Sequence, residues 1–159
     1  MPTSGSFQPP RPTPVVGQAV VATFNLQPLT VNVWHDTPFT ITLPEAGTYR
    51  VGGALRGNVT QLASDTIVGI AVFTQFVDVT AGGVIVPESF RTLAGATKPN
   101  QNIGTGNFGV QATSPVDFHY TIPEPRTLRL QGRRGGSTNV ASILGGPNSG
   151  SLVTYEKVA

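Results

Sequence analysis

The residues most capable of chemistry in this chain of 159 residues are two arginines beside two glycines, in the stretch TLRLQGRRGGSTN at residues 127–139. Arginine–glycine runs occur in RNA-binding tails, but those runs are repeated and disordered, whereas this one occurs once between two strand-like segments. A phosphate-binding P-loop needs GxxxxGK[ST] before a helix, and neither the lysine nor a helical pattern is present. We therefore predict a hairpin whose connection is residues 134–138, with glycines supplying positive φ at the bend. No nucleic-acid partner is expected.

Asp117 and His119 are the second candidate for chemistry, because residues two apart in a strand face the same side. A neutral imidazole beside a carboxylate can ligate a metal, but a site needs three or four ligands. The only other histidine is His35, in the turn-like sequence WHDTP. We predict surface hydrogen-bonded pairs for Asp117–His119 and for His35–Asp36, with Trp34 as a buried anchor. No metal and no cofactor are expected.

Other chemistry is disfavoured by composition. The chain has no cysteine and no G-x-S-x-G elbow, so nucleophilic triads and disulfides are not expected, and we predict no catalytic residues. It has no run of about 18 apolar residues for a membrane-spanning helix and no N-terminal core of signal-peptide length. Only 11% of residues are charged and the net charge is +2, which gives no basic footprint for a phosphate backbone. We expect a surface of uncharged polar residues, partly covered by copies or partners.

The elements that must position these residues have the period of β-strands. In PFTITL (residues 38–43) apolar side chains alternate with threonines, and TYRVGGALRG (residues 48–57) alternates again after a Pro/Gly turn. In the second segment Tyr49, Val51 and Leu55 share one face. Further strands are predicted at 66–73, 84–93, 107–112, 116–122, 127–133, 139–144 and 151–158. With 19 glycines and 14 prolines and no helical stripe, the class is all-β, a sandwich.

The N-terminal segment is expected to stay outside the sandwich. Residues 1–14 contain five prolines, which favour an extended, polyproline-like chain that cannot pair in a sheet. It is either a disordered tail or an arm that docks on a neighbouring subunit. We assign residues 1–30 to a Pro-rich docking arm and residues 31–159 to the folded domain. The candidate docking residues are Phe7, Pro9, Pro10, Val15 and Val16.

Two strands are apolar on both faces. In TIVGIAVF (residues 66–73) and in LVTY (residues 152–155) apolar side chains do not alternate with polar ones, so each strand needs two covers. The second cover is predicted to be another subunit; the alternative is that a loop or the N-terminal arm lies over the outer face.

Three segments carry a resemblance to a known fold. AGTYRVGGALRG (46–57), TLRLQ (127–131) and SGSLVTYEKV (149–158) resemble strands of C1q/TNF-like jelly rolls, and the same order occurs in small structural proteins of tailed-phage virions. The resemblance implies a jelly-roll sandwich of about ten antiparallel strands and a homotrimer whose closing strand lines the threefold axis. It departs from the pattern at Ser151, where the family usually has an aromatic. The candidate trimer-interface residues are Ile67, Ile70, Val72, Leu152 and Tyr155.

This resemblance implies a function in assembly. The chain is expected to be a non-enzymatic virion structural protein of a tailed bacteriophage, a minor tail protein or capsid decoration. Its arm would dock on major capsid or tail proteins, in a virion assembled in the host cytoplasm, with no membrane partner. The alternative is a tail-tip module that binds a host-surface glycan or protein, which predicts a groove with exposed aromatics. Outside clear strands only Phe7, Trp34 and Phe90 qualify, which favours the structural role.

Overall fold

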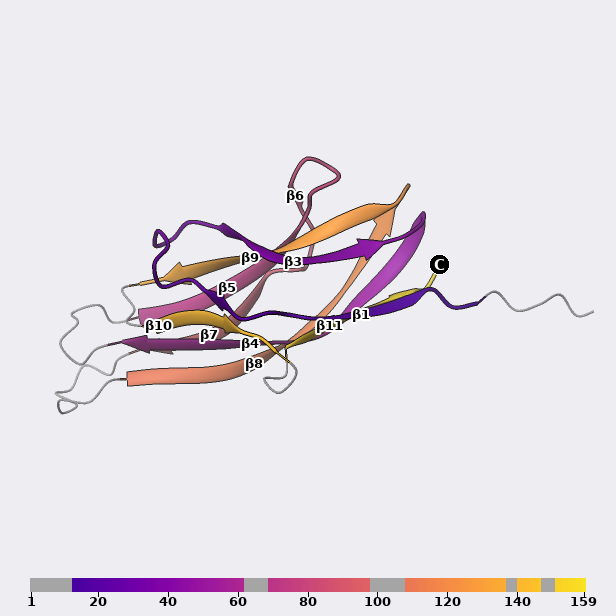
Figure 1. Cartoon of the computed structure of the whole chain (residues 1–159). Helices are drawn as coiled ribbons and strands as arrows, with labels where there is room; N and C mark the ends of the chain where they lie inside the picture. Colours follow the sequence, from indigo (N-terminus) through magenta and orange to yellow (C-terminus); the bar gives the residue numbers. More distant parts are fainter. Residues whose placement is uncertain (1–12, 62–68, 98–107, 137–139, 147–150) are drawn as a thin grey trace, which may run out of the picture.

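The computed structural model describes residues 13–61, 69–97, 108–136, 140–146 and 151–159, which form two antiparallel β-sheets stacked face to face (Figure 1). Sheet A contains β1 (Val16–Val20), β2 (Phe24–Asn25), β4 (Gly47–Gln61), β8 (Phe108–Ile122), β10 (Val140–Leu144) and β11 (Leu152–Lys157). Sheet B contains β3 (His35–Leu43), β5 (Gly69–Asp78), β6 (Val84–Ile85), β7 (Arg91–Thr97) and β9 (Arg126–Gly135). The described residues contain no helix long and apolar enough to cross a membrane.

The strand order is that of a jelly roll, the fold that the resemblance implies. In sheet A, β4 pairs with β8 along its full length on one side, and with β11 and then β10 on the other. β1 continues the sheet beyond β11, and β2 continues it beyond β10. In sheet B, β9 lies between β3 and β5, and β7 and β6 both pair with the far side of β5. This arrangement gives two sheets of four strand positions, the architecture of a double-sheet jelly roll.

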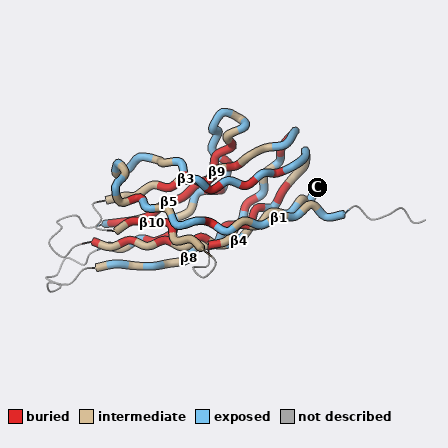
Figure 2. Tube along the Cα trace, in the orientation of Figure 1, coloured by how far each residue is buried: buried red, intermediate tan, exposed pale blue. Residues whose placement is uncertain are grey.

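The core lies between the sheets, where buried residues line the facing sides of both layers (Figure 2). In β4 the predicted face of Tyr49, Val51 and Leu55 is buried, with each side chain at most 1% exposed. Phe76 of sheet B packs against Phe118 of sheet A, with ring centroids 5.6 Å apart. Period-two alternation therefore places one face of each strand in the core, as hydrophobic burial requires.

Ser151 closes the gap between β10 and β11, which lie end to end along β4. Its hydroxyl accepts a hydrogen bond from the Arg56 amide (2.9 Å) and donates one to the Leu144 carbonyl oxygen, and the residue is 1% exposed. Nearby, Gly53 has φ of +130°, and an added Cβ would lie 2.1 Å from the Leu152 carbonyl oxygen. A bulky aromatic in place of Ser151 would leave these two partly buried backbone groups without this partner.

The long edge strand β8 is protected by side-chain bonds from the other sheet. Arg91 of β7 donates to the carbonyl oxygens of Pro115 (3.0 Å) and Asp117 (2.9 Å). Pro115 itself lacks an N–H, which is tolerated at a sheet edge. For that reason β8 runs unbroken from 108 to 122, where the sequence predicted two strands, at 107–112 and 116–122.

Three other boundaries differ from the prediction. The strand expected at 66–73 is β5, which starts at Gly69 among the described residues and continues to Asp78. The segment 84–93 is divided between β6 and β7 by a turn in which Glu88 has φ of +58°. The third difference concerns residues 1–30: β1 and β2 lie in sheet A, and Val21 and Leu26 are buried in the core. Residues 16–26 therefore belong to the sandwich, because no proline lies between Pro14 and Pro28 and the chain there is free to pair.

Candidate functional site

The arginine pair lies in β9 and not in a hairpin tip. Arg133 is opposite Phe73 and Arg134 is opposite Val72 in the β5–β9 ladder. The turn begins only at Gly136, whose φ is +79°. Arg134 donates two hydrogen bonds to the Leu29 carbonyl oxygen, at 2.7 and 3.0 Å. Its charge therefore serves to hold the segment before β3 against sheet B.

Arg133 forms part of an aromatic cluster on the outer face of sheet B. Its Cζ lies 4.8 Å from the ring centroid of Trp34 and 4.8 Å from that of Phe73. Phe90 stacks on Phe73 with centroids 5.7 Å apart and meets Trp34 edge to face at 6.2 Å. Trp34 is only half-buried, so the expected core anchor is instead a side chain of this surface cluster. We call these four residues the aromatic–arginine cluster.

The cluster explains the two-faced strand without a second subunit. Phe73 points out of the sandwich, and its ring is covered by Phe90 and by the guanidinium of Arg133. Ile70 and Val72 point the other way and are 3% and 0% exposed in the core. These two candidate interface residues therefore face the core, and on the outer side of β5 the ring of Phe73 is covered from within the subunit by Phe90 and Arg133.

The other candidate interface residues have different positions. Tyr155 faces inward, where its ring meets that of the buried Tyr49 edge to face at 6.0 Å. The same ring lies against Gly17, at which an added Cβ would be 2.4 Å from it. Leu152 is on the outer face of sheet A and half-buried. Ile67, like Phe7, Pro9 and Pro10 of the expected arm, lies outside the described residues. Val15 and Val16 are at the edge of sheet A, where Lys157 donates its amide to the Val15 carbonyl oxygen (2.8 Å).

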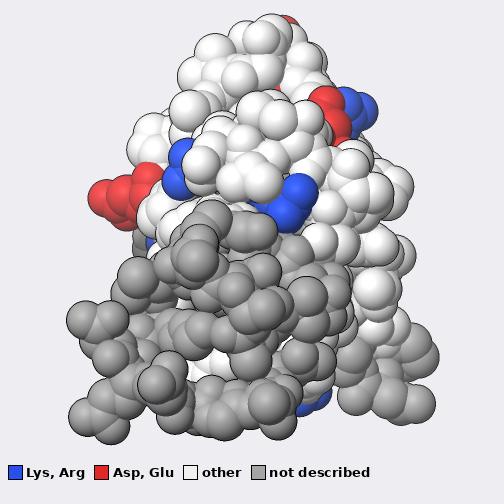
Figure 3. Space-filling view, turned by 90° about the vertical axis from the view of Figure 1, so that its left-hand side faces the viewer, with Lys and Arg blue, Asp and Glu red and all other residues white. Residues whose placement is uncertain are grey.

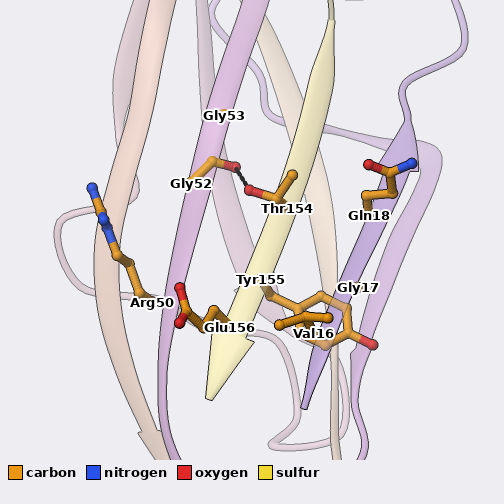
Figure 4. Close-up of a pocket in the computed structure, with 9 residues that line it drawn as sticks. All are labelled: Val16, Gly17, Gln18, Arg50, Gly52, Gly53, Thr154, Tyr155 and Glu156. Carbon is orange, nitrogen blue, oxygen red and sulfur yellow. Dashed lines mark hydrogen bonds between the residues drawn. The ribbon is translucent and has the colours of Figure 1, made fainter. Parts of the chain in front are cut away.

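The outer face of sheet A has a shallow cavity of about 640 Å³ across β1, β11 and β4 (Figure 4). Its floor is Gly52, whose carbonyl oxygen accepts a hydrogen bond from the Thr154 hydroxyl (3.2 Å). Val16, which is 61% exposed, and Gln18 form the β1 side. Arg50 and Glu156 carry the charge at one end, as Figure 4 shows. Glycine and threonine give the centre of this shallow cavity a low floor without charged side chains.

Asp117 and His119 do not form the predicted pair. Asp117 accepts two hydrogen bonds from the Arg50 guanidinium, at 2.9 and 3.1 Å, and these hold its pKa below the usual range. Asp36 likewise binds Arg129 (2.7 Å) and Gln131 (2.8 Å), not His35. Its pKa is lowered, chiefly by the Gln131 hydrogen bond and then by Arg129.

The described residues contain no group of three or more His, Cys, Asp or Glu that could hold a metal. A buried carboxylate does join the two sheets. Asp78, 0% exposed, accepts hydrogen bonds from the Tyr120 hydroxyl and the Ala81 amide, both at 2.9 Å. Arg126 lies 3.8 Å from it. Burial, and then the Asp78 hydrogen bond, raise the pKa of Tyr120. With its acceptor atoms engaged by three residues, Asp78 is a structural link between sheets A and B.

Among solved structures, the chain is similar in fold to proteins of virus particles. No protein-family model and no curated protein matches the chain. A structure of the infectious bursal disease virus Gx strain aligns with 17% identity and a TM-score of 0.49, covering 100% of this chain and 43% of that one. The T13 particle of the same virus aligns with 16% identity and a TM-score of 0.46, covering 100% and 40%. The chain thus spans less than half the length of these proteins, and similarity at this level does not establish a function.

Proposed function

We propose that the chain is a non-enzymatic virion structural protein, a homotrimeric surface appendage of a tailed phage of the minor tail or capsid decoration type. The trimer forms through the outer face of sheet A at β1, β11 and β4. The segment before β1 docks the trimer on major capsid or tail proteins of a virion assembled in the host cytoplasm. The low centre of the sheet A outer face at Gly52 and Thr154, bordered by exposed apolar residues of β1, is the observation that carries this proposal.

Two features of that face suit it to packing against copies of itself. Val16 and Val20 of β1 are 61% and 52% exposed, and Leu152 lies beside them on β11. Gly52 and Thr154 keep the centre low, so that a neighbouring strand can approach closely. The charged side chains next to this centre include an ion pair, in which Arg50 binds Asp117, the residue opposite Gly52 on β8. Apolar residues beside a low centre of small, uncharged residues suit the core of a homo-oligomer interface.

The docking role falls to residues 1–14, shorter than the 1–30 predicted from the sequence, because the chain joins sheet A from Val15 onwards. A proline-rich segment loses little conformational entropy on docking. Three arms on one trimer would act together through effective concentration, so that weak single contacts give firm attachment.

The trimer is tested by sedimentation velocity of the wild type and of Gly52→Arg. An added Cβ at Gly52 meets only ordinary contacts, 3.6 Å from Thr154 Oγ1 and 3.9 Å from the Val116 carbonyl oxygen, so the single subunit accommodates the change. We expect a trimeric wild type and a folded, monomeric Gly52→Arg. Thr42→Arg, which adds the same charge to the outer face of sheet B, should stay trimeric. A monomeric wild type at about 10 μM would refute the proposal.

The arm is tested separately by deleting residues 2–12 and following thermal unfolding and incorporation into particles. We expect an unchanged melting temperature, because the deletion stops before Val15, and loss of incorporation. Deleting residues 2–20 should lower the melting temperature as well, because it removes β1 and exposes Tyr155. Normal incorporation of the shorter deletion would contradict the docking role and would leave the trimer untouched.

A further inference from the structure

Arg133 differs from the other arginines that the structure describes. Each of the others donates to an oxygen acceptor: Arg50, Arg126 and Arg129 to carboxylates, Arg56 to an amide oxygen, and Arg91 and Arg134 to backbone carbonyls. Among the described residues Arg133 has no acidic partner, and its Nε is buried without a hydrogen bond. Its contacts are the rings of Trp34 and Phe73.

An arginine held in this way is poised to bind an anion. Rings that stack on a guanidinium occupy its faces and leave its in-plane N–H groups for an acceptor. Because Nε of Arg133 is itself buried, an incoming acceptor would meet the two terminal amino groups. An unsatisfied cationic donor that is partly removed from water is costly, and an anion from outside would relieve that cost.

A cavity of about 470 Å³ lies beside this guanidinium on the outer face of sheet B. Arg133 and Phe73 line it, together with Asn32, and its floor is made of small residues such as Gly69, Ala71 and Gly95. Its volume falls in the range of roughly 300–1,000 Å³ that small-molecule sites usually have. Among the described residues seen from this end of the sandwich, charged side chains form small patches within an uncharged surface (Figure 3). A single cation beside a shallow, mostly uncharged floor favours a ligand with one negative charge.

We propose that this cavity binds a carboxylate-bearing sugar of a host-surface glycan. The carboxylate accepts hydrogen bonds from the terminal amino groups of Arg133, in the paired geometry that guanidinium and carboxylate favour. The sugar ring packs against the part of Phe73 that lines the cavity and against the small residues of its floor. Asn32 supplies an amide to sugar hydroxyls at the cavity wall.

This site does not depend on the proposed trimer, because it lies on the opposite sheet from the proposed interface. A groove with exposed aromatic side chains is the feature expected of a receptor-binding module. The three aromatic residues of the cluster come from three separate segments of the chain. Trp34 precedes β3, Phe90 precedes β7, and Phe73 and Arg133 are opposite each other in β5 and β9. Recognition would therefore be an added property of the subunit, whatever its oligomeric state.

The experiment is an NMR titration of the full chain with 3′-sialyllactose, with a hyaluronan tetrasaccharide as an acidic sugar of another class, and with lactose as the neutral control. We expect saturable shifts with at least one acidic probe, and binding at least about tenfold weaker for lactose, the difference that a charge-assisted hydrogen bond gives. Binding of neither acidic probe, or equal binding of lactose, would overturn the proposal.

Two variants locate the site and one is a matched control. Arg133→Met keeps a long side chain over the rings but removes the charge, and should weaken binding of the acidic probe about tenfold or more. Gly95→Leu fills the cavity from its floor, where an added Cβ makes only ordinary contacts of 3.6–3.7 Å, and should abolish binding. Arg129→Met removes a charge from the same face of β9 and should leave the affinity within about twofold. Unchanged affinity in folded Arg133→Met or Gly95→Leu would overturn the proposal.

Discussion

The outer faces of the two sheets differ in the size and chemistry of their side chains. Sheet A presents a low, uncharged centre at Gly52 and Thr154, and none of the residues that the structure describes covers its β1–β11 half. Sheet B presents aromatic side chains, and the chain covers them itself by stacking Phe90 and Arg133 on Phe73. A strand that is apolar on both faces is thus not sufficient to identify an interface with another subunit. The surface left for a large partner is the one made of small residues.

The largest expected effect is the difference between two substitutions on β11, one on its inner face and one on its outer face. Tyr155→Asp should lower the free energy of unfolding by about 3–5 kcal/mol, because it removes a packed ring and places a carboxylate against the buried Tyr49. Leu152→Asp, three residues earlier on the outer face, should instead leave the subunit folded and abolish the trimer. Urea unfolding and sedimentation of both variants measure these effects. Dissociation of a stable Tyr155→Asp subunit would show that the ring faces a partner and not the core.

The next largest effect is the loss of stability when both Arg133 and Arg134 are replaced. The hairpin tip expected from the sequence predicts a change below about 1 kcal/mol for Arg133→Ala with Arg134→Ala, as at exposed turns. The structure predicts a loss of about 2 kcal/mol, because the double variant removes two cation–π contacts and the bonds to the Leu29 carbonyl oxygen. Equilibrium denaturation decides between the two values, with Arg56→Ala on the outer face of sheet A as the comparison.

The smallest expected effect is a shift in the pKa of two carboxyl groups, Asp36 on the outer face of sheet B and Asp117 on the outer face of sheet A. The folded-state pKa values of Asp36 and Asp117 are both lowered, so each stabilises the fold above its unfolded pKa of about 3.9 and loses this contribution as pH falls through the folded value. The first cause is the neutral Gln131 amide for Asp36, and the Arg50 guanidinium for Asp117. Salt at about 1 M should therefore raise the pKa of Asp117 more than that of Asp36, measured by NMR titration. Equal shifts of the two pKa values would mean that the Arg129 guanidinium, and not the Gln131 amide, is the main cause of the lowered pKa of Asp36.

Much of the fold could be predicted from the sequence, because period-two alternation reports the side of a strand directly. It placed β4 and β9 within a few residues and put Tyr49, Val51 and Leu55 on one face of β4, where each is at most 1% exposed. The pattern predicted two strands in place of β8, separated near Pro115. Alternation cannot distinguish an edge strand, which tolerates proline, from a central strand. It also missed β1 and β2, because proline-rich composition was extended past Pro14 into residues that pair.

The sites were much less accessible to sequence reasoning. The aromatic–arginine cluster joins positions 34, 73, 90 and 133, and no local pattern connects residues that far apart. In the sequence Arg133 ends a predicted strand and is followed by Arg134 and two glycines, a pattern that predicts the tip of a hairpin. The signal that could have found it is Phe73, an outward aromatic on β5 directly opposite an arginine on β9, once the pairing of these strands is known.

The central claim, that the outer face of sheet A and not that of sheet B is covered by other copies, is tested most directly by thiol labelling. The chain has no cysteine, so Gln18→Cys on β1 and Thr42→Cys on β3 each introduce one reactive group at an exposed strand position. We predict that raising the protein concentration slows labelling at position 18 and leaves position 42 unchanged, because oligomerisation follows mass action. Equal labelling of both positions at all concentrations, or protection of position 42 alone, would contradict the account.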